Sequence, residues 1–182
     1  RGELQGYAGD DAIGVAFQPG SGVLMLYDSA ARRAVAWVAD AGSCPYWEFA
    51  APLRGLWHWW HESRGRQLVH GAAVGGEHGA VLLTGKGGSG KSSTALAALL
   101  AGMYYLGDDY VVCEPGPPPV VHSLYSSAKL DEDALVRMPA LAPRLALSAG
   151  ADREKALLLA GGDFLVLRRD LRQQECRRRW AL

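Results

Sequence analysis

The sequence is poor in the features of secreted and membrane-spanning proteins. Its three cysteines, Cys44, Cys113 and Cys176, are odd in number and widely spaced, and no CxxC pair occurs, so neither a zinc site nor a redox motif is predicted. No apolar run approaches the length of a membrane span, and the opening RGELQGYAGD has neither a signal-peptide core nor an initiating Met. We therefore expect a reduced, cytoplasmic protein, and a chain that is a fragment or has been trimmed.

The chain also lacks net charge. Lys+Arg and Asp+Glu number 19 each, so no overall electrostatic field attracts nucleic acid or an anionic membrane, and we expect neither as a partner. The charge is uneven, because residues 163–182 hold six Arg against Asp163, Asp170 and Glu175. We expect residues 161–182 to form an Arg-rich tail that is solvated, disordered or truncated. A basic arm that docks on an acidic ligand is the alternative.

The first third of the chain is rich in β-strand signals. Short apolar or alternating runs, separated by PGSG and SAARR, predict a small N-terminal sheet at residues 12–17, 22–27 and 34–39. The stretch that follows has Trp and Leu at helical spacing and predicts a helix that buries an aromatic face. Within it, WHWWH (57–61) carries two His three residues apart, but no third ligand is near, so we interpret it as core packing. These elements define an expected N-terminal region, residues 1–62.

Residues 63–160 are expected to form the core domain. Strand-like runs at 67–75 and 80–85 are followed by an Ala/Leu-rich helix at 89–102 and a further strand at 103–115. Strand, Gly-rich loop, helix and strand is the order of a βαβ unit. With 182 residues, the chain is long enough for one such domain and a small appendage. The predicted fold class is therefore α/β.

The Gly-rich loop of this unit reads GKGGSGKS at residues 85–92 and matches the P-loop, or Walker A, motif G-x-x-x-x-G-K-[ST] in full. Glycines let backbone N–H groups turn onto phosphate oxygens, and the start of the helix adds its dipole. A flexible Gly/Ser loop is the alternative, but the position between an apolar strand and a helix favours nucleotide binding. The motif predicts ATP and Mg²⁺ as cofactors, with Lys91 on the β- and γ-phosphates and Ser92 on Mg²⁺. The expected nucleotide-binding residues are Gly85, Lys86, Gly87, Gly88, Ser89, Gly90, Lys91, Ser92 and Ser93.

Two adjacent carboxylates, Asp108 and Asp109, interrupt the strand that follows the P-loop helix. In the expected fold this strand lies beside the P-loop strand and points its C-terminal end at the same crevice. Neighbouring side chains on a strand face opposite ways, so one carboxylate would serve Mg²⁺ and the other would accept the proton of an attacking hydroxyl. A solvated acidic turn is the alternative. His70 ends the preceding strand-like run, and it either reaches the same crevice or is a packed structural His.

The ordered set LVHGAAV, GKGGSGKSSTALAALLAGMYYLGDDYV and HSLYSSAKL resembles the HPr kinase/phosphorylase-like family of P-loop serine kinases. The resemblance covers about residues 50–155. It is especially strong to stand-alone bacterial HPr-kinase-like proteins, some of which accompany peptide-maturation genes. It implies an α/β P-loop core related to phosphoenolpyruvate carboxykinase, preceded by a small β-rich region. Because relatives form oligomers, it also implies a homo-oligomer.

The same resemblance implies roles for the site residues. Lys91 and Ser92 match the P-loop Lys and the Mg²⁺-binding hydroxyl of the family. Asp108 matches the general base, which doubles as the acid of the reverse reaction. Asp109 matches the neighbouring position near the metal, and His70 matches the His that orients this cluster. The roles of the two Asp are open to exchange.

The acceptor side is less clearly marked. One segment that relatives also carry contains Ser126, Ser127 and Lys129. This segment either lines the acceptor or phosphate side of the site or is a surface loop. After residues 154–160 the chain lacks the downstream signature and C-terminal helices with which HPr enzymes grip their substrate, so HPr is not the expected substrate. We expect a kinase that transfers the γ-phosphoryl group of ATP to a serine of a peptide or protein. The alternatives are a nucleotide-binding regulatory module without transfer activity and a carboxykinase-like small-molecule enzyme.

Overall fold

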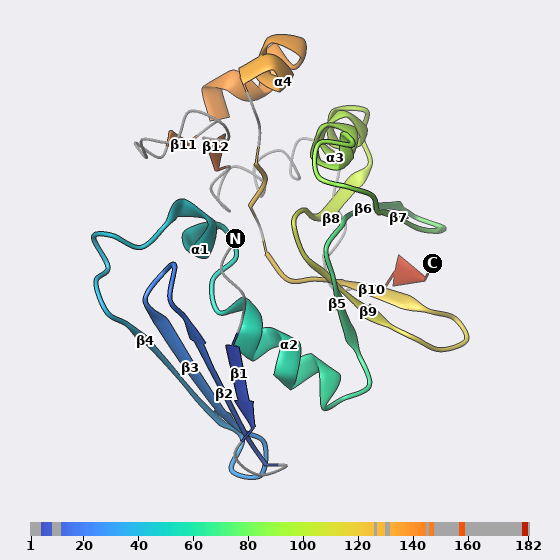
Figure 1. Ribbon diagram of the computed structural model, residues 1–182. Helices are drawn as coiled ribbons and strands as arrows, with labels where there is room; N and C mark the ends of the chain where they lie inside the picture. The colour runs from blue at the N-terminus through green and yellow to red at the C-terminus, as the bar shows by residue number, and fades with distance from the viewer. Residues whose placement is uncertain are drawn as a thin grey trace. The chain divides into compact units, whose positions relative to one another are not determined.

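The structure, a computed structural model, describes residues 5–8, 12–125, 127–129, 132–144, 146–147, 157–158 and 180–181. The chain divides into two compact units, Arg1–Leu68 and Val69–Leu182. Figure 1 follows them along the chain from blue to red. Apart from Trp180–Ala181, the Arg-rich tail expected at 161–182 lies outside the described residues.

The first unit is built on a four-stranded antiparallel sheet of order β1-β2-β3-β4, in which each strand pairs with the next one along the chain (Figure 1). The short turns between the apolar runs of the sequence allow this meander, because antiparallel neighbours need only a tight connection. The strands are β1 (Gln5–Ala8), β2 (Ile13–Gln18), β3 (Val23–Asp28) and β4 (Arg33–Val38). The helices are α1 (Tyr46–Ala50) and α2 (Arg54–Glu62).

One face of this sheet packs against α2. The buried cluster consists of Val23, Met25, Tyr27 and Leu56, with Cys44, Trp59 and Trp60 packed against it. Gly55 permits the close approach of helix and sheet, since a Cβ there would lie 3.0 Å from the Cε of Met25. His61 is buried and its ring meets that of Trp60 edge to face, with centroids 4.6 Å apart. The WHWWH stretch therefore takes part in packing, and no group of three metal-ligating side chains occurs among the described residues.

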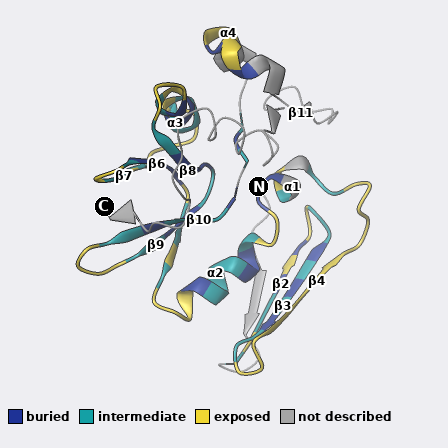
Figure 2. Cartoon of the chain, turned by 180° about the vertical axis from the view of Figure 1, so that it is seen from behind, coloured by how far each residue is buried: buried dark blue, intermediate teal, exposed yellow. Residues whose placement is uncertain are grey.

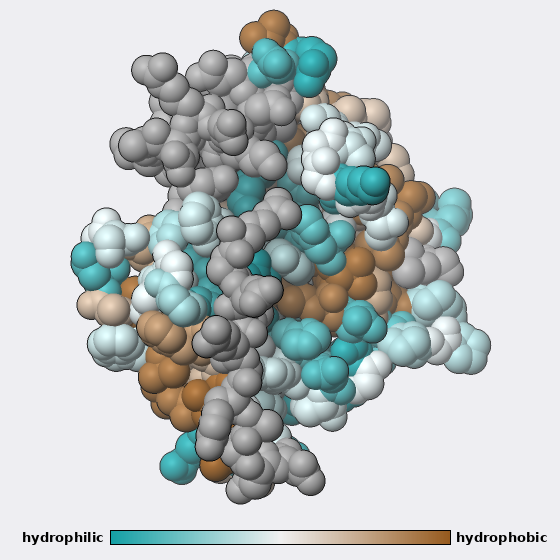
Figure 3. Space-filling model, in the orientation of Figure 1, coloured by the Kyte–Doolittle hydropathy of each residue, from teal (hydrophilic) through white to brown (hydrophobic). Residues whose placement is uncertain are grey.

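The opposite face of the same sheet carries exposed apolar side chains. Phe17 pairs with Leu24, and Leu24 pairs with Trp37, so these residues lie in one row across the sheet. They face away from Met25 because successive side chains on a strand alternate. The large apolar residues exposed here are Ile13, Phe17, Val35 and Trp37. Figure 3 shows that apolar patches lie between hydrophilic areas on the face of the molecule that it draws.

The second unit contains small antiparallel sheets of order β7-β6-β8, β13-β10-β9-β5 and β11-β12. Its strands are β5 (Gln67–Val69, which contains the division between the units), β6 (Ala72–Gly76), β7 (Gly79–Leu83), β8 (Tyr104–Gly107), β9 (Val111–Glu114), β10 (Val120–Ser123), β11 (Ala146–Leu147), β12 (Leu157–Leu158) and β13 (Trp180–Ala181). Its helices are α3 (Lys91–Leu100), α4 (Glu132–Arg137) and the 3-10 helix η1 (Pro139–Arg144).

The predicted α/β class, with an HPr-kinase-like and carboxykinase-like core, is wrong. Every described strand pair whose direction is resolved is antiparallel, and strand (36%) exceeds helix (23%). The physical reason lies in the turn at Glu77–His78, which joins β6 and β7 as a tight hairpin. β6 thereby lies between β7 and β8 and is antiparallel to both. β7 and β8 run in the same direction but are not neighbours, so the parallel pair expected of a βαβ unit does not form.

The helix that follows the P-loop is held by the core of the second unit. Its buried cluster consists of Ala72, Val74, Ala95, Leu96, Leu99, Tyr105, Ala128, Met138 and Leu141. Leu96 and Leu99 of α3 are fully buried, and Figure 2 shows the dark, buried part of α3. This packing positions the start of α3, where the Gly-rich loop ends. α3 has 10 residues, and no described helix is both long and apolar enough to cross a membrane.

Candidate nucleotide-binding site

The Gly-rich loop connects the end of β7 to the start of α3. Gly88 has φ 78° and Gly90 has φ 87°, both in the left-handed region that favours glycine. A Cβ built at Gly87, Gly88 or Gly90 meets no atom within 4 Å, so the space over this part of the loop is open. The loop therefore has the backbone conformation and the free space that a phosphate cradle requires. Gly90 directly precedes α3, whose first N–H groups have no partner within the helix.

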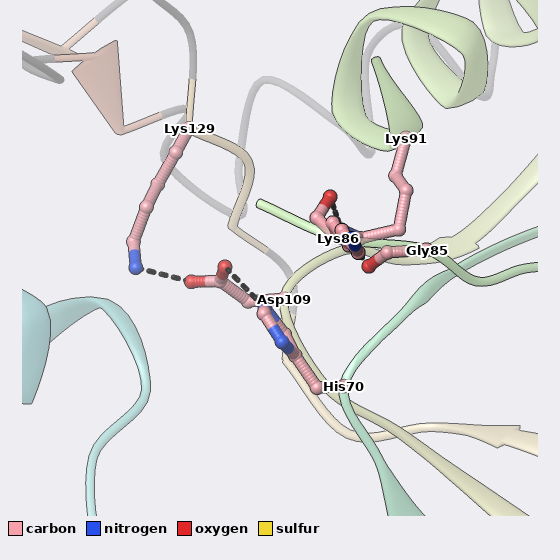
Figure 4. A network of polar contacts seen from close by, with 6 residues as sticks. All are labelled: His70, Gly85, Lys86, Lys91, Asp109 and Lys129. Carbon is pink, nitrogen blue, oxygen red and sulfur yellow. Dashed lines mark hydrogen bonds and ion pairs between the residues drawn. The ribbon is translucent and has the colours of Figure 1, made fainter. Parts of the chain in front are cut away.

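Lys91 folds back over this loop. Its Nζ donates hydrogen bonds to the carbonyl oxygens of Gly85 (2.9 Å) and Lys86 (3.0 Å), as Figure 4 shows. The ammonium group is thus held at the loop by neutral acceptors, and it forms no ion pair with a carboxylate of the described residues. A phosphate oxygen is a stronger partner for an ammonium group than a carbonyl oxygen, because it carries charge. The arrangement leaves Lys91 close to the place where the loop would hold a phosphate.

Asp108 lies directly after β8 and is only 1% exposed. Burial raises the pKa of its carboxyl group, although the hydroxyl of Ser92 and the backbone N–H groups of Asp109 and Lys129 donate hydrogen bonds to it and act in the opposite direction. The Oδ2 atom has no hydrogen-bond partner among the described residues. A buried carboxylate oxygen without a partner is costly and suits a cation or a cation-bound water. Asp108 and Ser92 therefore bring two side-chain oxygen donors together at the start of α3.

Asp109 turns in a different direction from Asp108. Its φ of 65° places it in the left-handed region, and its carbonyl oxygen accepts a hydrogen bond from the N–H of Gly71 (3.2 Å). Its carboxylate forms an ion pair with Lys129, and its Oδ1 lies 3.9 Å from the Nε2 of His70 (Figure 4). The Asp109 side chain is 20% exposed, far more accessible than that of Asp108. The left-handed turn is what separates the two neighbouring carboxylates.

His70 follows β5, and its ring stacks on that of Tyr110, with centroids 5.2 Å apart and planes inclined by 28°. Burial lowers the pKa of His70, the Asp109 carboxylate opposes this effect, and the ammonium groups of Lys91 and Lys129 add to it. The imidazole is therefore favoured in its neutral form near pH 7.

Comparison with known proteins adds no relative. No family model matches the chain, and searches of curated proteins and of solved structures found no significant match. What the chain does must therefore be argued from its own residues.

The second unit brings most of the expected site residues together. Lys91, Ser92, Asp108, Asp109 and His70 interact directly or through their charges. Ser92 is hydrogen-bonded to Asp108. The expected metal site at Ser92 and Asp109 stays a prediction. Ser93 is half-buried in the first turn of α3.

Lys129 is the residue whose role in the site the sequence left open. The ion pair with Asp109 crosses 20 positions of the chain, and no local pattern marks it. Its only signal was its place in the segment shared with the resembling family. Of the two serines of that segment, Ser126 lies outside the described residues. The carbonyl oxygen of Ser127 accepts a hydrogen bond from the hydroxyl of Tyr105 (3.2 Å).

Proposed function

We propose that this chain binds ATP with Mg²⁺ and transfers the γ-phosphoryl group to a serine hydroxyl of a peptide or protein. The observation that carries the proposal is the pairing of the buried Asp108 carboxylate with the hydroxyl of Ser92, directly behind a glycine loop in left-handed conformation. In P-loop enzymes a loop Ser or Thr and a strand-end Asp hold Mg²⁺ in this way. These local contacts form without an α/β core.

The residues present fit both cofactors. Gly87, Gly88 and Gly90 leave open space at the loop, and Lys91 supplies a mobile cation for the β- and γ-phosphates. Ser92 and Asp108 would hold Mg²⁺, and Asp108 Oδ2 is the oxygen that lacks another partner. Mg²⁺ commonly uses only one or two protein ligands, because phosphates and waters complete its shell. When bound, it supplies positive charge across the phosphates.

The accessibility of the two carboxylates supports an exchange of the roles that the resemblance implied. Asp108 is 1% exposed and accepts three hydrogen bonds, so it is poorly placed to meet an acceptor hydroxyl. Asp109 is partly exposed and lies beside His70. In the proposed mechanism, Asp109 takes the proton of the acceptor hydroxyl, and neutral His70 orients its carboxylate. Lys91 and Ser92 keep the roles expected of the P-loop.

The acceptor class is supported by the sequence resemblance to P-loop serine kinases, and it belongs to the proposal. So does a cytoplasmic setting, which the few, widely spaced cysteines support and which supplies ATP and Mg²⁺. The alternative of nucleotide binding without transfer makes a different prediction in the same assay, so one experiment separates the two.

The test incubates the purified chain with Mg-ATP and a pool of serine-containing peptides, and identifies phosphopeptides by mass spectrometry. Asp109→Asn is the matched variant, because Asn tolerates the left-handed conformation, has nearly the same shape and removes the basic carboxylate together with its ion pair to Lys129. We expect phosphoserine with the wild type and at least about a hundredfold less with Asp109→Asn, with nucleotide binding retained. Bound nucleotide without phosphopeptide in the wild type would leave only the regulatory module, and failure to bind nucleotide would remove the proposal altogether.

A further inference from the structure

We propose that Lys129 is a further catalytic residue. Its ammonium group leaves the Asp109 carboxylate and binds the oxygens of the phosphoryl group while that group is transferred. This inference rests on the proposed function and deepens it. Its starting point is the ion pair between Lys129 Nζ and Asp109 Oδ2, in which both side chains are about one-fifth exposed, 19% and 20%.

The backbone near Lys129 is held independently of this ion pair. The carbonyl oxygen of Ser127 accepts a hydrogen bond from the hydroxyl of Tyr105, which is buried in β8. Ala128 is 1% exposed and belongs to the core of the second unit. The backbone N–H of Lys129 donates to the Asp108 carboxyl group. Because these contacts already anchor the segment, its ammonium group is not needed to fix it in place.

The two ammonium groups of the site come from different elements. Lys91 belongs to α3, whereas Lys129 belongs to the segment that follows β10. Figure 4 shows Lys91 reaching Gly85 and Lys86, and Lys129 reaching Asp109. Both lower the pKa of the same imidazole, that of His70, so both act on one region. Lys91 is held by carbonyl groups of the nucleotide loop, whereas Lys129 is held by the proposed base. This assigns Lys91 to the nucleotide side and Lys129 to the acceptor side.

The chemistry of phosphoryl transfer gives such a second cation a task. Negative charge spreads over the equatorial oxygens of the migrating group, and a cation that meets it accelerates transfer strongly. A lysine on a flexible stem, with three donors, is suited to change partners. When its ammonium group leaves Asp109 for those oxygens, Asp109 loses the ion pair that stabilised its charged form and becomes a stronger base.

The step balances without a further reactant. The bond between the serine oxygen and the γ-phosphorus forms, and the bond between that phosphorus and the bridging oxygen of ADP breaks. The electron pair of the broken bond leaves with ADP. The hydroxyl proton goes to Asp109, which Lys129 has released.

The test compares Lys129→Met, Lys129→Arg and the control Arg137→Met, which removes one positive charge from an exposed position on α4. ADP formation from Mg-ATP is measured with the serine-peptide pool to give kcat and KM, nucleotide affinity is measured with a fluorescent ATP analogue, and Tm is measured for each protein. We expect Lys129→Met to lower kcat by about 10²- to 10³-fold, with nucleotide affinity changed by less than about threefold. Lys129→Arg should recover part of kcat, and Arg137→Met should match the wild type.

The outcomes separate this inference from the function on which it rests. If the wild type forms ADP and Lys129→Met does so at the same kcat, Lys129 is not catalytic and the proposed function stands. If nucleotide affinity, Tm and kcat fall together in Lys129→Met and Lys129→Arg, the ion pair is structural and the inference is overturned. If the wild type binds nucleotide but forms no ADP, the proposed function and this inference both fail.

Discussion

Gly71 directly precedes β6, and one methyl group added there should disturb both this strand and the candidate site. A Cβ at this position would lie 2.8 Å from the carbonyl oxygen of Leu83, a distance that real Cβ atoms essentially never show. The obstacle is backbone of β7, which cannot rotate away as a side chain can. The N–H of Gly71 also donates to the carbonyl oxygen of Asp109, so displacement of Gly71 pulls on the Asp-Asp turn. Gly71→Ala is therefore expected to disturb both the start of β6 and the approach of His70 to Asp109.

The expected cost of Gly71→Ala is about 1–3 kcal/mol, the usual range for overpacking a well-filled site. Gly76, at the other end of β6, provides the control, because a Cβ there meets nothing within 4 Å and its φ is not left-handed. Gly76→Ala should be neutral or stabilise the fold by up to about 1 kcal/mol through the unfolded chain. A difference of about 2 kcal/mol corresponds to about 1 M in the urea midpoint at a slope of about 2 kcal/mol/M.

Urea unfolding should be followed by far-UV circular dichroism. Tryptophan emission reports mainly the first unit, since five of the six Trp residues precede residue 69. Equal urea midpoints for Gly71→Ala and Gly76→Ala would refute the reasoning, because the steric contact would then be relieved without cost. A lower midpoint for Gly71→Ala with unchanged phosphoryl transfer would separate the stability of β6 from the geometry of the site.

Two further predictions concern the core and the buried carboxylate. Leu99→Ala, at a fully buried position of α3, should lower the free energy of unfolding by about 2–5 kcal/mol. Leu100→Ala, at an exposed position of the same helix, should change it by less than about 1 kcal/mol. Equal effects of the two variants in thermal unfolding would contradict the packing of α3. Burial raises the pKa of Asp108 above its ordinary 3.8, so its contribution to stability is complete below that value and is lost as the pH rises through the raised pKa. The stability of Asp108→Asn relative to the wild type should therefore increase from pH 4 to pH 8. Asp40→Asn provides the opposite case at lower pH, because the N–H of Gly42 lowers the pKa of Asp40 below 3.8, so its contribution to stability is lost as the pH falls through the lowered pKa. The stability of Asp40→Asn relative to the wild type should therefore decrease as the pH rises from about 2 to about 5, and an increase there would be inconsistent with this shift.

Local sequence patterns predicted the parts of the molecule that depend on neighbouring residues. The N-terminal meander follows from apolar runs and short turns, and β2, β3 and β4 form where those runs lie, whereas β1 was not predicted. The glycine loop follows from a motif whose residues need left-handed backbone, as Gly88 and Gly90 have. The prediction of the fold class failed because strand neighbours are chosen over long distances. β8 pairs with β6, across the whole P-loop and α3, and nothing within either segment specifies that partner.

The sequence by itself determined that a glycine cradle, a lysine and a hydroxyl stand together, because eight consecutive residues carry all of them. It also placed two carboxylates beside each other, but it left their tasks open. Only the tertiary structure decided which carboxylate meets Ser92 and which meets Lys129. The physical reason is that burial and charge pairing arise from side chains distant in sequence. The left-handed turn at Asp109 sends one carboxylate into the core beside α3 and leaves the other facing a lysine from the segment after β10.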